Sequence, residues 1–349
     1  MWTDRREFLR RSGLGFGALA FRAMAAPKPH FAAKARSVIF LFMHGGPSHV
    51  DTFDPKPALA RYHGQPVPPS FGSADFQFTR IDKVPLLASR RTFRKRGQSG
   101  LEISDLFENV AQHADDLAVI RSCHHDGFTH TTGQHWMNNG WSRIGRPSVG
   151  SWIVYGLGSE SENLPAYMVM LDGSLKAGPP LYGSGFLPAN YQGTVLRSKG
   201  APVLNASPPP GVSRERQREM LDLLAWNNER HLETRREDSD LAARIAAYEL
   251  AFKMQTSAPE LAGLEGESEA TRRLYGLDDD GTAGFGRQCL LARRMVERGV
   301  RFVQVFSGGG DPGWDGHNQC DRNHLEMASK VDRPIAGLLA DLKSRGLLE

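Results

Sequence analysis

The chain has 349 residues, of which 40% are hydrophobic and 23% are charged, and its formal net charge is +4. Five arginines and two acidic residues fall within residues 1–25, so this segment carries +3 of the total. The rest of the chain is close to neutral. That argues against a nucleic-acid binder, because such proteins gain affinity by neutralising phosphates. Three cysteines without a CxxC spacing argue against a disulfide framework and a thiolate zinc site.

The N-terminus has the features of an export signal. The pair Arg5-Arg6 precedes a short apolar stretch rich in Gly and Ala, and Ala23-Met24-Ala25 is a small-x-small cleavage sequence. The apolar stretch, about nine residues, is too short to span a bilayer core of roughly 30 Å. We predict a twin-arginine signal peptide over residues 1–25 and a linker over residues 26–36. The twin-arginine translocase would then be a partner during export, and the mature protein would be periplasmic or secreted. A cytosolic amphipathic helix with an incidental arginine pair and an uncleaved membrane anchor are the two alternatives.

Apolar runs and helical periodicities alternate along the rest of the chain. Four apolar runs predict buried strands, at residues 37–43, 117–120, 166–171 and 300–306. Four stretches have helical spacing, at residues 101–114, 213–255, 288–298 and 324–346. Residues 55–100 and 174–212 are rich in turn-forming residues and predict irregular structure. The alternation favours an α/β domain with a mostly parallel central sheet flanked by helices on both faces. No stretch of the mature chain predicts a transmembrane segment.

Polar clusters follow three of the four predicted strands. In parallel sheets, ligands bind beyond the carboxyl ends of the strands. Eight of the twelve histidines lie in these three windows. The histidines and aspartates are His44, His49, Asp51 and Asp54 in the first window; His124, His125, Asp126, His130 and His135 in the second; and Asp311, Asp315, His317 and His324 in the third.

Imidazole and carboxylate groups at several strand ends suit a hard or borderline divalent metal. We expect His44, Asp51, Asp315 and His317 to bind the metal, with Zn²⁺ or Ca²⁺ as the ion. His130 and Thr131 are the expected catalytic residues, with the Thr131 hydroxyl as the candidate nucleophile. A serine esterase is a weaker interpretation. It would use the His-Gly-Gly sequence at residues 44–46, but it also requires a GxSxG elbow, which is missing from the sequence.

Residues 40–57, with the sequence FLFMHGGPSHVDTFDPKP, resemble the start of the DUF1501 family. That family contains exported proteins and is grouped with the alkaline phosphatase and sulfatase-like superfamily. Residues 145–160 and 313–317 and the Asn-Asn-Gly turn at residues 138–140 extend the resemblance over almost the whole mature chain.

This resemblance implies a two-metal site for phosphate or sulfate esters on a sheet flanked by helices. In that superfamily an aspartate closes the first strand, a place that His44 occupies here, with Asp51 a few residues later. The aspartate and histidine after a late strand are similar to Asp315 and His317, and the place of the nucleophile falls near His130. The superfamily continues beyond the helix in which this chain stops. The resemblance therefore implies a partial, C-terminally truncated domain over residues 37–349.

Two functions follow as expectations. The first is an exported metal-dependent hydrolase that acts on sulfate or phosphate esters of small molecules or polysaccharides. The alternative is a non-catalytic periplasmic binding or assembly module on the same fold, because the usual nucleophile is not clearly present.

Overall fold

The structure is a computed structural model, and it describes residues 32, 34–68, 84–197, 211–233, 239–308 and 313–348. The chain divides into two units, residues 1–36 with Glu349 and residues 37–348. The second unit contains all the helices and strands described below. The predicted signal peptide over residues 1–25 and Asp311 of the third histidine window lie outside the described residues.

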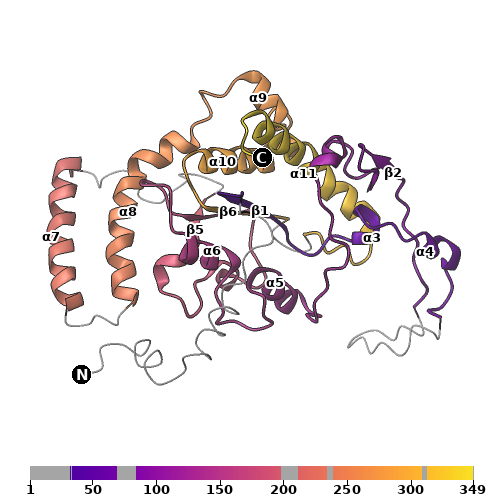
Figure 1. Cartoon of the computed structure of the whole chain (residues 1–349), viewed down its shortest axis with the longest axis horizontal. Coiled ribbons are helices and arrows are strands. Elements are labelled where there is room, and N and C mark those ends of the chain that lie inside the picture. Colours follow the sequence, from indigo (N-terminus) through magenta and orange to yellow (C-terminus); the bar gives the residue numbers. More distant parts are fainter. Residues whose placement is uncertain are drawn as a thin grey trace. The chain divides into compact units, whose positions relative to one another are not determined.

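Four parallel strands form the central sheet, in the order β1-β6-β4-β5 (Figure 1). They are β1 (Val38–Met43), β4 (Tyr167–Leu171), β5 (Thr194–Leu196) and β6 (Phe302–Ser307). The sequence predicted β1, β4 and β6 from their apolar runs; β4 and β6 are buried between two layers of helices, whereas β1, at the edge of the sheet, is mostly half-buried. Since β1 and β6 are neighbours with Met43 opposite Ser307, the segments that follow them leave the sheet side by side.

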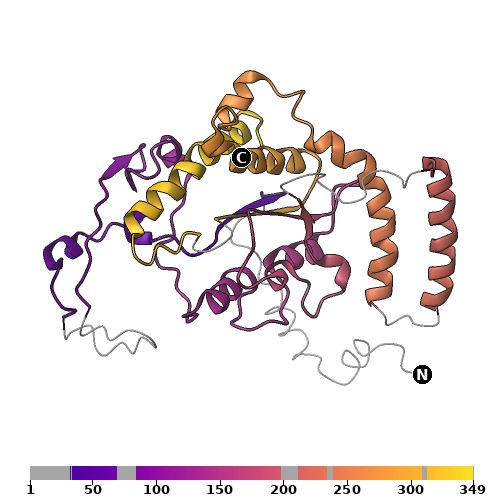
Figure 2. The ribbon, with the colours of Figure 1, turned by 180° about the vertical axis from the view of Figure 1, so that it is seen from behind.

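Helices cover both faces of the sheet. The α-helices are α3 (His49–Thr52), α4 (Pro57–Tyr62), α5 (His130–Asn139), α6 (Val149–Leu157), α7 (Arg214–Glu233), α8 (Ser239–Ala262), α9 (Glu269–Leu274), α10 (Asp280–Glu297) and α11 (Cys320–Ser344). Figures 1 and 2 draw α10 and α11 on one side of the sheet and α5 and α6 on the other. The structure is therefore an α/β fold with a parallel sheet between helical layers.

Side chains of successive strand residues enter two separate cores, as the period-two geometry of a strand requires. Met168 of β4 packs in the same core as Leu290 of α10. Its neighbour Tyr167 packs in the other core with Val154 of α6. Within the described residues, no helix is long and apolar enough to cross a membrane.

Two predicted elements are wrong. Residues 101–114 form no α-helix: β3 (Leu101–Ser104) pairs antiparallel with β2 (Phe93–Arg96), and a 3-10 helix follows at Val110–Asp116. The apolar residues with helical spacing in this segment, among them Ile103, Phe107 and Val110, are all buried, but a strand, a turn and a 3-10 helix bury them.

Residues 117–120 form no strand, and Ile120 is 71% exposed. The position beside β4 is taken by β5, a strand of three residues within the Gly- and Pro-rich segment. A strand this short leaves almost no period-two pattern to detect. The long helical stretch predicted from residue 213 is two helices, α7 and α8. The short 3-10 helices Pro179–Tyr182 and Ala189–Tyr191 complete the segment before β5.

Candidate functional site

The candidate site lies beyond the carboxyl ends of β1 and β6. The His44 backbone N–H donates to the carbonyl of Ser307 at 2.8 Å, and the Trp314 N–H donates to the His44 carbonyl at 2.9 Å. The chain after β6 is therefore tied back to the end of β1. A Cβ on Gly313, whose φ is +59°, would lie 2.3 Å from the Gly308 carbonyl oxygen, so this turn requires glycine. Asp315 follows two residues after Gly313, at this edge of the sheet.

Trp314 anchors the same loop to the core. Its indole is fully buried and stacks on Phe107 at 6.5 Å between ring centroids. The indole N–H also faces the Ser307 hydroxyl at 3.4 Å. Because the residue before Asp315 is fixed in this way, the position of the Asp315 carboxylate is set by packing.

Helix α5 supplies His130 at its first position. Thr129 caps the helix, and its hydroxyl and the Thr132 backbone and hydroxyl form a reciprocal capping box. Gly140 ends the helix in the left-handed conformation with φ +65°. His130 lies four and eight residues before Gln134 and Asn138, so these three side chains share one face of α5.

A chain of buried polar side chains fixes this face on the sheet. The Gln304 amide of β6 donates to Asn138 Oδ1 at 2.6 Å and accepts from the Tyr167 hydroxyl. Gln134 Nε2 lies 3.1 Å from His44 Nδ1, and Gln134 Oε1 accepts from the Ala177 N–H at 3.3 Å. Burial raises the pKa of Tyr167, which keeps its hydroxyl protonated as a donor. The orientation of α5, and with it the direction of His130, follows from these contacts.

We expect Gln304→Leu to lower the free energy of unfolding by about 1–3 kcal/mol, because it leaves Asn138 Oδ1 and the Tyr167 hydroxyl buried without their partner. Urea unfolding followed by circular dichroism measures the change. Gln112→Leu is the matched control, because Gln112 is exposed and its loss should leave the midpoint unchanged. Equal midpoints for Gln304→Leu and the wild type would contradict a structural role for the polar chain.

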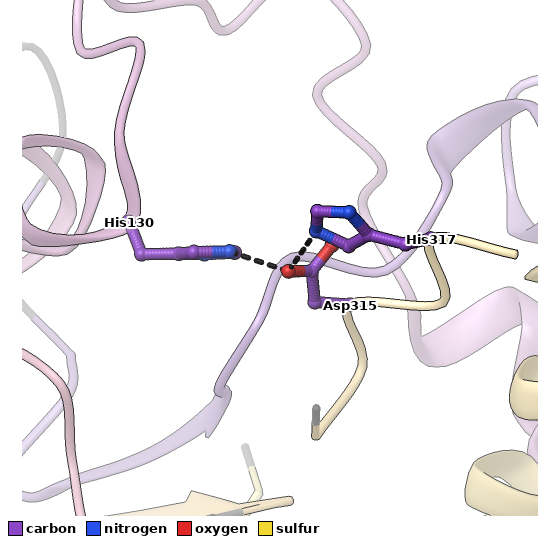
Figure 3. A group of neighbouring side chains, drawn as sticks. All are labelled: His130, Asp315 and His317. Carbon is purple, nitrogen blue, oxygen red and sulfur yellow. Dashed lines mark hydrogen bonds and ion pairs between the residues drawn. The ribbon is translucent and has the colours of Figure 1, made fainter. Parts of the chain in front are cut away.

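His130, Asp315 and His317 converge on one point (Figure 3). The Nε2 atoms of His130 and His317 each lie 2.6 Å from Oδ2 of Asp315. The Asp315 and His130 side chains are 19% and 31% exposed, whereas His317 is 73% exposed. One ligand atom from each of the three lies within 4.8 Å of the others, and no other group of this kind occurs among the described residues.

These three residues fit a divalent metal with two imidazole ligands and one carboxylate ligand. Tetrahedral Zn²⁺ with bonds of about 2.0–2.1 Å holds its ligand atoms about 3.4 Å apart, so an ion needs the two histidine rings to retreat from Asp315 by about 1 Å. One loop and one helix end carry these side chains, and the 73% exposure of His317 leaves it free to shift. Three protein ligands with an open position are typical of a catalytic site, not of a structural one.

Three cavities lie next to the group of His130, Asp315 and His317. Asp315 and His317 line a cavity of about 650 Å³ together with Lys176 and Arg322. They also line one of about 340 Å³ with Ser48 and His324. His130 lines a third of about 540 Å³ that includes Gly45 and Gly46. Lys176 and Arg322 bring positive charge to the first cavity, where Glu326 also lies and pairs with Arg322 at 3.0 Å.

The other predicted metal ligands lie outside this group. His44 is 1% exposed, contacts Gln134 and does not belong to the group. Both carboxylate oxygens of Asp51 accept hydrogen bonds, from the Ser48 hydroxyl at 2.6 Å and from the Ser89 hydroxyl at 2.5 Å. Thr131 is exposed and follows His130 on α5.

The remaining histidines of the windows serve packing or face solvent. His324 Nε2 accepts from the Ser48 backbone N–H at 2.7 Å, and its Nδ1 donates to the Cys320 carbonyl at 2.8 Å. His135 is buried on α5 and His124 is exposed. Sequence reasoning missed Gln134, Asn138 and Gln304. The i, i+4, i+8 spacing from His130 on a helix was the available signal for the first two.

Comparison with known proteins identifies the family to which the chain belongs. Residues 35–349 match the family described as "Protein of unknown function (DUF1501)". No curated protein and no solved structure matches the chain.

Proposed function

The chain belongs to the DUF1501 family, and from this premise we propose that it is an exported, metal-dependent hydrolase of sulfate or phosphate esters. The observation that carries the proposal is the convergence of His130 and His317 on one oxygen of Asp315. The site lies at the carboxyl edge of a parallel sheet, where α/β enzymes bind ligands. This placement supports an alkaline phosphatase and sulfatase-like superfamily assignment, and the twin-arginine sequence supports a periplasmic location.

Each residue of the candidate site has a role in the proposed reaction. His130, Asp315 and His317 hold a divalent metal, Zn²⁺ or Ca²⁺, which when bound supplies Lewis-acid polarisation of the ester oxygen. The buried polar chain under α5 aims His130. Lys176 and Arg322 line the adjoining cavity and orient an anionic ester by charge.

Two hydroxyl groups near the site are already engaged. The Ser48 hydroxyl donates to Asp51, and the Thr129 hydroxyl is part of the cap of α5. Thr131 is exposed beside His130, and the proposal assigns the attacking oxygen either to its hydroxyl or to water. Thr131→Val separates the two, because it abolishes turnover only in the first case.

The engagement of these hydroxyls favours the second candidate, a periplasmic binding or assembly module without catalysis. Both candidates use the same metal group and differ in turnover. Aryl sulfates and aryl phosphates distinguish them, because the coloured product reports hydrolysis directly.

The test begins with the metal content of the exported protein, followed by chelation and titration with Zn²⁺ or Ca²⁺. We expect a stoichiometric ion in the wild type and a loss of affinity of about 100-fold in His317→Ala, because one of three ligands is removed. His124→Ala is the matched control, since this histidine is exposed and outside the group. Wild-type protein without bound metal would contradict both the hydrolase and the metal-binding module. Metal binding without turnover would leave the binding module.

A further inference from the structure

Helix α7 has two different faces. Figures 1 and 2 both draw it beside α8, against which it packs. The half-buried positions on α7 include Leu221, Leu224 and Leu232, which fall on one side of the helix. Arg218 joins the two helices through paired hydrogen bonds to Glu249, at 3.0 and 2.6 Å. The side that faces α8 is thereby defined.

The opposite face carries large apolar side chains in solvent. Met220 is 57% exposed, Leu223 is 61% exposed and Trp226 is 52% exposed. Their spacing of three residues keeps them on one side of the helix within two turns. We call these three residues the α7 stripe. Single exposed apolar residues are ordinary, but a contiguous row on one helix face marks an interaction surface.

Four of the charged residues around the α7 stripe are ordered so that opposite charges meet when the helix is paired with a reversed copy of itself. Arg216 and Glu219 precede the stripe, and Arg230 and Glu233 follow it. In an antiparallel pair of α7 helices with the twofold axis between Leu224 and Ala225, Glu219 faces Arg230 of the second copy and Arg216 faces Glu233. The same register places Leu223 against Trp226. A parallel pair would instead place each charge beside its own kind, which is repulsive.

We propose that the α7 stripe is a homodimer interface in which two copies of this chain pack their α7 helices antiparallel. A twofold interface must be self-complementary, and Arg216, Glu219, Arg230 and Glu233 meet that condition, while the same register places Glu229 opposite Met220. Among the described residues, Arg216 and Glu219 pair with each other at 3.7 Å and are about 70% exposed, and Arg230 lies over the Trp226 ring. They are available to a second copy at little cost. The interface does not involve the metal group, so the two proposals are independent.

Sedimentation velocity across a dilution series tests the proposal on the full mature chain. We expect a concentration-dependent dimer for the wild type and a monomer at every concentration for Leu223→Glu with Trp226→Glu. Ile144→Glu is the matched control, because Ile144 is 70% exposed and far from α7 in the sequence, and its dimer should persist. Circular dichroism of these exposed-site variants checks that the helices remain.

A charge exchange tests the antiparallel register. Glu219→Arg and Arg230→Glu are each expected to weaken dimerisation roughly tenfold, because each puts like charges together at two symmetric positions. The double variant restores the opposite charges and is expected to return to the wild-type dissociation constant. A monomeric wild type, or a double variant no tighter than the single ones, would overturn the proposal. Co-sedimentation of a monomeric wild type with anionic vesicles would assign the stripe to a lipid surface.

Discussion

Replacing Arg293 by Met is expected to lower the free energy of unfolding by up to about 3–5 kcal/mol, because it removes the buried cation of a carboxylate cluster and leaves Glu267, Glu297 and Asp341 with only the more exposed Arg294 and Arg345. Arg293 lies on α10 with its side chain 4% exposed. Its guanidinium is 2.6 Å from Glu297 and 3.0 Å from Glu267 and from Asp341. These partners come from α10, from the segment before α9 and from α11. One side chain therefore ties together the helical layer on that face of the sheet.

The electrostatics of this cluster support a large effect. Burial alone would lower the pKa of Arg293, but Glu297 and Glu267 outweigh burial, so the pKa is raised and the charge is kept. Asp341 is 8% exposed and also accepts from the Tyr275 hydroxyl at 2.9 Å. Arg293→Lys keeps the charge but cannot reach three carboxylates at once, so we expect a smaller loss than for Met.

Urea unfolding compares these variants with Arg273→Met, the matched control. Arg273 also pairs with a glutamate four residues away, but that pair is 63% and 90% exposed. Exposed pairs contribute little, so we expect the control to change stability by less than about 0.5 kcal/mol. A loss in Arg293→Met no larger than in Arg273→Met would contradict a stabilising role for the buried cluster.

The sequence predicted the strands that are long enough to have a pattern. β1, β4 and β6 are strands of five or six residues, and apolar residues make up all of β1 and β4 and four of the six positions of β6. β5 has three residues, and its place in the sheet depends on pairing with Met168 to Met170, which no local pattern encodes. The segment at residues 101–114 shows the opposite failure. The buried residues there have helical spacing, but the segment begins as the second strand of a hairpin. Gly97 and Gly100, with φ of +61° and +66°, form the turn of that hairpin.

The site was predictable to the extent that it is local. Asp315 and His317 are two residues apart after a strand, and both belong to the group that converges in the structure. His44 and Asp51 also follow a strand, but the side chains take other partners, Gln134 for the first and two serine hydroxyls for the second. The direction of His130 depends on the contact between Asn138 and Gln304, which are 166 residues apart in the sequence. No spacing within one window contains that information.

The Asp315→Asn variant is expected to lose metal affinity by about 100-fold or more and to keep its fold. Loss of a residue that only positions a metal ligand lowers metal affinity about 10–100-fold. Loss of the shared carboxylate ligand should therefore lower the affinity by an amount at or beyond the upper end of that range. Asp315 is the group that brings both imidazoles together, with each Nε2 at 2.6 Å. Its stability without metal should change by only about 1 kcal/mol, because the ion pairs are partly exposed.

His44→Ala is the informative comparison, because the sequence predicts His44 among the metal ligands and in the structure it contacts Gln134 and lies outside the group. We expect this variant to lose about 1–3 kcal/mol of stability through the unpaired Gln134 amide. Its metal affinity should fall less than about tenfold, since any effect must pass through the position of α5. Isothermal titration with Zn²⁺ and urea unfolding of both variants measure the two quantities separately. If His44→Ala lost metal as completely as Asp315→Asn while remaining folded, His44 would be a ligand and the three-residue group would be incomplete.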